Sequence, residues 1–140
     1  MDYSQITELN AQALSRAIHV REVSCREAMQ AYLQRIARFN PTYNAIVNLQ
    51  PEAALLAHAD AHDALLARGE SKGWLHGMPQ AIKDISPVAG MPCTWGSPLL
   101  KHSVPAEDGL MAARMRAAGA IFIGKTNTPE FGLGACQTHG

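Results

Sequence analysis

The spacing of apolar residues predicts two helices at the start of the chain. Thr7 is placed to cap a first helix that runs to about His19, with apolar side chains recurring at three- and four-residue steps. Ser24 and Glu27 stand three residues apart, as a capping box requires, and a similar apolar spacing follows them. This second helix is expected to end where the Asn-Pro pair at 40–41 interrupts the spacing.

A third helix and a short extended stretch are expected next. Residues 43–49 alternate apolar and polar side chains over too few positions to separate a strand from an extended link. Pro51 is placed like the first residue of a helix, and the Ala- and Leu-rich run after it closes at Arg68. Gly69 follows, where a glycine commonly ends a helix. Three helices are therefore expected in the first half of the chain.

Glycine and proline become frequent after residue 69, and the short apolar pieces between them predict strands. Residues 80–85 and 120–124 are strand candidates, and residues 107–118 between them have the spacing of an amphipathic helix. The order strand, helix, strand predicts a βαβ unit in a mixed or parallel sheet. The side chains expected on the buried face of this helix are Leu110, Met111, Met115 and Ala118.

Composition is that of a single folded domain and excludes several classes of protein. The 140 residues weigh 15.1 kDa and are 47% apolar and 17% charged, which suffices for a core and does not indicate disorder. Twelve basic residues balance twelve acidic ones, so no nucleic-acid partner is expected. No apolar run is long enough for a membrane span, and residues 1–20 lack the apolar stretch of a signal peptide.

The cysteines indicate a reducing compartment. Cys25, Cys93 and Cys136 are an odd number without CxxC spacing, which favours neither a disulfide framework nor a zinc site. Together with the absence of a targeting pattern, this predicts a cytoplasmic protein. Nothing in the sequence calls for a metal or another cofactor.

A nucleotide-binding pattern occurs in the second half of the chain without its structural context. Residues 119–126 read GAIFIGKT and match the P-loop pattern GxxxxGK[ST], which needs a strand before its first glycine and a helix from its lysine. Here Gly119 follows a predicted helix, and the next residues are apolar, as in a strand. We therefore interpret Gly119 as a glycine that ends a helix and Lys125 as a residue at a strand end. Nucleotide binding is the lesser alternative.

Three further groups of residues have both a chemical and a structural interpretation. His58 and His62 have the spacing of two metal ligands on one helix, but no third ligand is evident and a solvated helix face is favoured. Cys136 and His139 suggest a thiol nucleophile with its base, although a packed cysteine is favoured. Four apolar side chains suit a substrate channel or loop packing over the sheet equally: Trp74, Met78, Met91 and Trp95.

Lys83 is the most informative polar residue of the predicted strand at 80–85. Its side chain shares a face with those of Ala81 and Ile85, because side chains alternate along a strand. Burial among such neighbours would disfavour the charged amine and leave a neutral general base. The alternative, favoured by the local sequence alone, is an edge-strand lysine that reaches solvent or pairs with a carboxylate.

Residues 75–140 resemble the amidase signature family of serine amide hydrolases. The matching segments are, in chain order, LHGMPQAIKD at 75–84, AGMPCTWGSP at 89–98, Asp108, and RMRAAGAIFIGKTNTPEFGLG at 114–134. Several such segments in one order are more specific than any one of them. The resemblance implies an α/β fold in which amino-terminal helices, residues 1–70, precede the first strands of a mixed, largely parallel sheet, residues 71–140.

The resemblance also implies a mechanism, in which a Ser-cisSer-Lys triad hydrolyses a carboxylic amide by acyl transfer. Lys83 corresponds to the catalytic lysine, and both serines are expected beyond residue 140. Ser86, Ser97 and Ser103 do not sit in a Gly- and Ser-rich segment of the kind that the family uses. The 140 residues are therefore expected to be the amino-terminal part of a single amidase domain and to be inactive alone.

Three functions stay open on the sequence alone. A stand-alone amidase acting on a small-molecule amide and the amidase subunit of a tRNA-dependent amidotransferase both fit the resemblance. A homodimer is compatible with either. The third is a complete, noncatalytic binding or assembly module of 140 residues.

Overall fold

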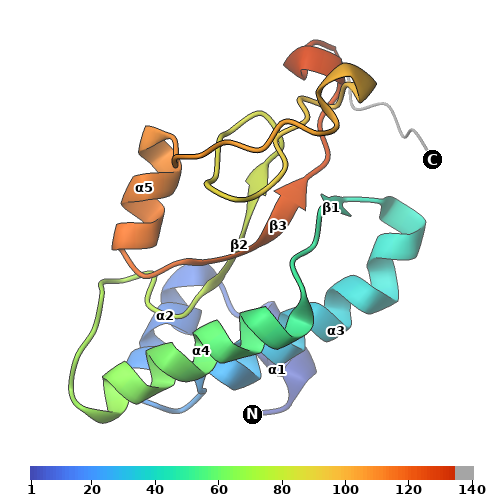
Figure 1. The fold of residues 1–140 in the computed structure, drawn as a ribbon. Coiled ribbons are helices and arrows are strands. Elements are labelled where there is room, and N and C mark those ends of the chain that lie inside the picture. The colour runs from blue at the N-terminus through green and yellow to red at the C-terminus, as the bar shows by residue number, and fades with distance from the viewer. Residues whose placement is uncertain (135–140) are drawn as a thin grey trace.

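Strands and a helix alternate in the second half of the chain, after a first half of four helices and one short strand. The computed structural model describes residues 1–134, and Figure 1 shows α1 to α4 gathered below the strands, with the segments after β2 and β3 at the top. The elements are α1 (Tyr3–Glu8), α2 (Ala11–His19), α3 (Cys25–Tyr43), β1 (Ile46–Val47), α4 (Glu52–Ala67), β2 (Pro79–Lys83), α5 (Leu110–Ala117) and β3 (Ile121–Thr126), with 3₁₀ turns at Pro98–Leu100 and Glu130–Gly132.

The expected first helix is two helices, so the prediction of one helix capped by Thr7 is wrong. α1 begins after Asp2, whose side chain caps it, and Thr7 lies inside it. The chain is extended at Leu9, and the Asn10 side chain then accepts the N–H of Ala13 at 2.9 Å. Because this second cap satisfies a free donor of the next turn, a new helix starts there.

The capping box predicted for α3 is confirmed, but the helix runs further than expected. The Ser24 hydroxyl accepts the N–H of Glu27 at 3.0 Å, and the Glu27 carboxylate accepts the N–H of Ser24 at 2.9 Å. Pro41 lies within the last turn, and the helix ends at Tyr43, where Asn44 is left-handed with φ 46°. A proline this close to the end removes only one helical hydrogen bond, so it does not stop the helix where the sequence suggests.

The third predicted helix is confirmed as α4. Pro51 precedes its first residue rather than forming it, and Gly69 follows its end with a left-handed φ of 78°. Within residues 1–134, none of the helices has the length and apolar character needed to cross a membrane.

Asp63 of α4 fixes the start of α3. Its carboxylate accepts the N–H groups of Cys25 at 2.7 Å and Arg26 at 3.1 Å, two donors that have no partner within their own helix. The Arg26 guanidinium also pairs with Asp60 at 2.5 Å. Burial and the nearby Asp63 carboxylate raise the pKa of the Cys25 thiol, so this cysteine stays protonated. The two helices are thus joined by polar contacts as well as by packing.

Gly77 allows the strand layer to approach this helix start. Its φ is 72°, and a Cβ at this position would lie 2.1 Å from the Sγ of Cys25, which is fully buried. The core therefore continues from the helices to the strands. Its largest fully buried apolar side chains are Ile6, Leu14, Ile18, Val23, Met29, Leu55 and Val88.

The three strands form one mixed sheet in the order β1–β3–β2. β3 pairs in parallel with β2 and antiparallel with β1, and α5 connects the two parallel strands. This confirms the predicted βαβ unit and shows that residues 43–49 contribute a short strand. Residues 121–125 of β3 are all buried, so this central strand is covered on both faces.

The buried face predicted for the helix at 107–118 is wrong in part. α5 starts only at Leu110, after Gly109, and Leu110 and Met111 are exposed. The buried residue is Ala112, and Met115 and Ala118 pack beside it as expected. The helix contacts the core through Ala112, Met115 and Ala118, and its first turn, with Leu110 and Met111, is exposed to solvent.

Asp108, one of the residues that carry the resemblance, has a structural position before α5. Its carboxylate accepts the Ala89 N–H at 2.8 Å and pairs with Arg116 at 2.7 Å. The Arg116 guanidinium holds the pKa of the Asp108 carboxyl below its usual value and stacks 4.8 Å from the centre of the Phe122 ring. Asp108 therefore connects the loop at Ala89 to α5, and Arg116 of α5 in turn contacts the central strand at Phe122.

The capping box gives a stability prediction. Ser24→Ala removes the acceptor for the Glu27 N–H and should lower the free energy of unfolding of the chain by about 1 kcal/mol, measured by urea denaturation. Gln34→Ala, at an exposed site of the same helix, is the control and should leave it nearly unchanged. Equal stability of the Ser24→Ala variant and the unaltered chain would contradict the role of the cap.

Candidate active site

Lys83 lies at the carboxyl end of β2, beside the end of β3. Its register partner in the parallel pair is Thr126. Its Nζ donates a hydrogen bond to the carbonyl of Asn127 at 3.1 Å. In open α/β sheets, ligands bind at the edge formed by the carboxyl ends of the strands. Lys83 therefore presents an amine at the edge where such sheets place their chemistry.

Of the two environments considered for Lys83, residues 1–134 show the edge-strand lysine that reaches solvent, and burial among apolar neighbours is not observed. The Lys83 side chain is exposed, and Ala81 on the same face of β2 is only half-buried, as is Ile85, which lies in the turn after the strand rather than in it. Ile82, which points to the opposite face, is 2% exposed. The reason is the position of β2 at the border of the sheet, where nothing in the described residues covers this side of the strand end.

A tight turn follows β2 and is held from several sides. The Ser86 N–H donates to the Lys83 carbonyl at 2.9 Å, which closes the turn. The Asp84 N–H donates to the Thr126 carbonyl at 3.0 Å, so the pairing with β3 continues one residue past the strand. The Asp84 carbonyl accepts the Trp95 N–H at 2.9 Å. These bonds fix the position of the backbone at Lys83 and Asp84.

The Asp84 carboxylate is buried and organises the next loop. It is 2% exposed, and it accepts hydrogen bonds from the N–H of Thr94, at 3.1 Å, and from the Thr94 hydroxyl. The adjacent Cys93 thiol is also buried, and burial raises its pKa. Two donors on one carboxylate offset much of the cost of burying its charge.

Lys125 is the second lysine at this edge, and it is fully buried. Its Nζ donates to the carbonyl of Ser86, within the turn that follows Lys83. Burial lowers the pKa of Lys125, while the nearby Cys93 and Asp84 act in the opposite direction. The sequence pattern places Lys125 at a strand end and does not by itself predict its burial. The available signal is its position directly after the predicted strand at 120–124.

The structure supports the rejection of a P-loop at residues 119–126. Gly119 follows α5 with φ 99°, as a helix-ending glycine does, and residues 121–126 form β3. Asn127 continues the pairing through its N–H to the Ala45 carbonyl at 2.9 Å. The lysine of the pattern is thus inside a strand and buried, not at the start of a helix.

The three serines after Lys83 have different environments. Ser97 is 2% exposed and its hydroxyl donates to Glu130 at 2.7 Å. Ser86 is half-buried, and Ser103 is exposed. The Ser97 hydroxyl also accepts the N–H of Leu99 at 3.4 Å, as a capping serine does. The Ser97–Glu130 bond ties the loop after β2 to the segment after β3.

His58 and His62 of α4 have different environments. No group of three metal-ligating side chains occurs within residues 1–134. His58 is exposed, but His62 is 8% exposed, so the expected solvated helix face is wrong for His62. Its Nδ1 donates to the His58 carbonyl at 2.8 Å, and its ring lies 4.8 Å from that of His76, edge to face. Cys136 and His139 lie outside the described residues.

The four apolar side chains expected near a channel are not alike. Met78 and Met91 are buried in the core, whereas Trp74 and Trp95 are 59% and 39% exposed. Trp95 belongs to the loop beside Lys83, and its carbonyl accepts the Phe131 N–H at 2.7 Å. The two methionines therefore pack in the core rather than line a channel. Of the four side chains, Trp95 is the one near the candidate site.

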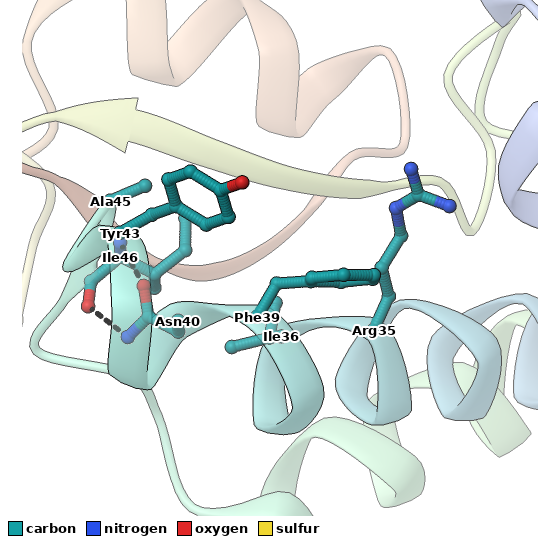
Figure 2. A pocket seen from close by; sticks show the side chains of 7 residues that line it. All are labelled: Arg35, Ile36, Phe39, Asn40, Tyr43, Ala45 and Ile46. Carbon is teal, nitrogen blue, oxygen red and sulfur yellow. Dashed lines mark hydrogen bonds between the residues drawn. The ribbon is translucent and has the colours of Figure 1, made fainter.

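A separate hollow of about 420 Å³ lies between α3 and β1, away from both lysines in sequence (Figure 2). Phe39 and Tyr43 line it with their rings, and the Arg35 guanidinium lies 5.5 Å from the centre of the Phe39 ring. Figure 2 shows Asn40 bonded to the backbone of Ile46, whose N–H donates at 2.7 Å and whose carbonyl accepts at 2.9 Å. Asn40 thus satisfies the outer edge of β1 as a neighbouring strand would.

Comparisons of the sequence with known proteins identify its family. A sequence profile of the family described as Amidase matches residues 27–139. A glutamyl-tRNA(Gln) amidotransferase subunit of Acidothermus cellulolyticus is 40% identical over 132 residues, which cover 94% of this chain and 26% of that protein. The corresponding protein of Thiobacillus denitrificans is 44% identical over 123 residues, covering 88% of this chain and 25% of that protein.

Solved structures show the same fold. The native peptide amidase from Stenotrophomonas maltophilia matches with a TM-score of 0.81 at 34% identity, over 89% of this chain and 26% of that chain. A fatty acid amide hydrolase matches with a TM-score of 0.84 at 24% identity, over 91% of this chain and 22% of that chain, which supports the fold alone.

Amino-terminal helices and a small mixed sheet, together with the similarity to these solved structures, define the class as the α/β fold of amidase signature enzymes. The chain belongs to the amidase family. It spans about a quarter of the length of the curated relatives that it matches.

The burial of His62 gives a pH prediction. Burial lowers its pKa below the value of about 6.5 expected in the unfolded chain. The unfolded chain therefore takes up this proton first as the pH falls, so the free energy of unfolding should decrease from about pH 7 downward. Denaturation with urea at several pH values checks this.

Two variants separate His62 from other titrating groups. His62→Gln should reduce the loss of stability between about pH 7 and pH 5, whereas His58→Gln, at an exposed site on the same helix, should retain it. A chain that becomes more stable over this range, or identical slopes for the His62 variant and the unaltered chain, would rule out the assignment.

Proposed function

We propose that this chain supplies the base of an amide-hydrolysing site and that Lys83 is that base. The observation that carries the proposal is its place at the carboxyl ends of two parallel strands, with its amine on the Asn127 carbonyl and otherwise exposed. Membership of the amidase family and the similarity to a peptide amidase support a reaction at a carboxylic amide.

The contacts of Lys83 suit proton transfer. A neutral amine has two N–H groups and one lone pair, and the bond to Asn127 uses one N–H. The lone pair is then free to accept the proton of a bridging serine hydroxyl, which in turn deprotonates a second serine. The second serine attacks the amide carbonyl, the amine leaves with a proton, and water hydrolyses the acyl-enzyme. We place both serines beyond residue 140.

Lys83 must lose its proton before it can act as a base. Apolar surroundings favour the neutral amine, and the exposed position of Lys83 in residues 1–134 does not provide them. A further segment that covers this edge and carries the serines would provide both the apolar surroundings and the nucleophile. We therefore propose that the 140 residues alone do not hydrolyse amides.

The relatives favour a second, more specific candidate. Proteins named as subunits of glutamyl-tRNA(Gln) amidotransferase match up to 96% of this chain. On this proposal the chain belongs to an amidase subunit whose hydrolysis of amides depends on partner subunits. Ammonia release that requires an added partner would favour this candidate, and release by the purified protein alone would favour a stand-alone amidase.

Substitution of the lysine tests the proposal in the full product of the reading frame that encodes this chain. Lys83→Ala should lower amide hydrolysis, measured as ammonia release, by about 10²- to 10⁴-fold, as expected for loss of a general base. Lys101→Ala, at an exposed lysine in a loop, is the matched control and should keep normal turnover.

Two outcomes would refute the proposal. One is near-normal turnover by the Lys83→Ala variant with its fold intact by circular dichroism. The other is the absence of both hydrolysis and reaction with a serine-directed acylating probe in the unaltered product, which would instead favour a noncatalytic binding or assembly module.

A further inference from the structure

Two lysines connect the ends of β2 and β3, because each donates a hydrogen bond to the backbone that follows the other strand. Lys83 of β2 donates to the carbonyl of Asn127, just after β3, at 3.1 Å. Lys125 of β3 donates to the carbonyl of Ser86, just after β2. The register partner of Lys125 is Ile82, not Lys83, so the two lysine side chains point to opposite faces of the sheet.

Lys125 differs from Lys83 in its surroundings. It is 0% exposed, and a buried amine is costly unless its N–H groups have partners. The electrostatic influence of the Asp84 carboxylate and the Cys93 thiol favours its charged form, against the effect of burial. Asp84 is the residue directly after Lys83. The buried Lys125 therefore contacts the turn at 83–86, which begins at Lys83, the proposed base.

The backbone of Ser86 connects the two lysines. Its N–H donates to the carbonyl of Lys83 at 2.9 Å, and its carbonyl accepts from Lys125. Both backbone polar groups of Ser86 are thus used, one toward each lysine. Without Lys125, the Ser86 carbonyl would lose its donor, and the end of the turn at Ser86 would keep only the closing bond to Lys83, while the bonds of Asp84 to Thr126 and Trp95 hold its start.

We propose that Lys125 is a positioning residue for Lys83, which holds the turn at 83–86 from the buried face of the sheet and so keeps the Lys83 amine at the Asn127 carbonyl. The catalytic consequence rests on the proposed function of Lys83, but the positional effect does not. The experiments below measure the two separately.

Acetylation of individual lysines in the 140-residue chain tests the positional effect. Brief treatment with acetic anhydride and mass spectrometry give the rate at each lysine. In Lys125→Met the rate at Lys83 should rise by about threefold or more, because the turn opens more often. The rate at Lys72, which is exposed and outside the turn, should not change. Lys125→Arg, which keeps a cationic donor, should restore the Lys83 rate, and Lys101→Met is the matched control.

Hydrogen exchange of the unaltered chain tests whether the turn at 83–86 is held in place, even if Lys125→Met does not fold. The Ser86 amide should exchange about tenfold or more slowly than in an unstructured peptide, because its turn is held on both sides. Exchange at the unprotected rate would overturn the inference. An unchanged Lys83 acetylation rate in a folded Lys125→Met variant would overturn it as well.

Kinetics of the full product of the reading frame test the catalytic consequence. Lys125→Met should lower kcat by about tenfold or more and leave KM within about twofold, because misplacement of a base affects the chemical step. Lys125→Arg should recover part of kcat, whereas unchanged kcat in Lys125→Met would refute this consequence. If Lys83→Ala is fully active, the proposed function fails while the acetylation result still decides the positional effect.

Discussion

Parallel pairing of β2 with β3 is the constraint on which the candidate site depends. It sets Lys83 against Thr126 and Ile82 against Lys125, and it brings the carboxyl ends of both strands to one edge. The turn after β2 and the segment after β3 can then each accept a hydrogen bond from a lysine of the opposite strand. One pairing therefore accounts for an exposed amine on one face and a buried amine on the other.

The helices of the first half of the chain support this edge by positioning the start of β2. Asp63 fixes the start of α3 on α4, and Gly77 lets the chain pass close to the buried Cys25 before β2 begins. The central strand β3 is buried along residues 121–125, so hydrophobic burial anchors the strands below the edge. The polar network around Asp84 then has only to organise the loops above it.

Local signals explain what could be predicted. The capping box at Ser24 and Glu27, the third helix and the βαβ unit follow from short-range spacing, and so does the rejection of the P-loop at 119–126. The errors arise where two local signals compete or where packing decides. Asn10 caps a new helix inside an expected one, and α5 buries small side chains instead of Leu110 and Met111.

The sequence alone determined the type of most elements and placed Lys83 on a strand, because periodicity and capping act between neighbours in the chain. It also determined the family, through several segments in a fixed order. Only the tertiary structure decided which lysine is buried. Alternation along a strand says which side chains share a face, but the covering of that face depends on distant elements, and these bury Lys125 and leave Lys83 exposed.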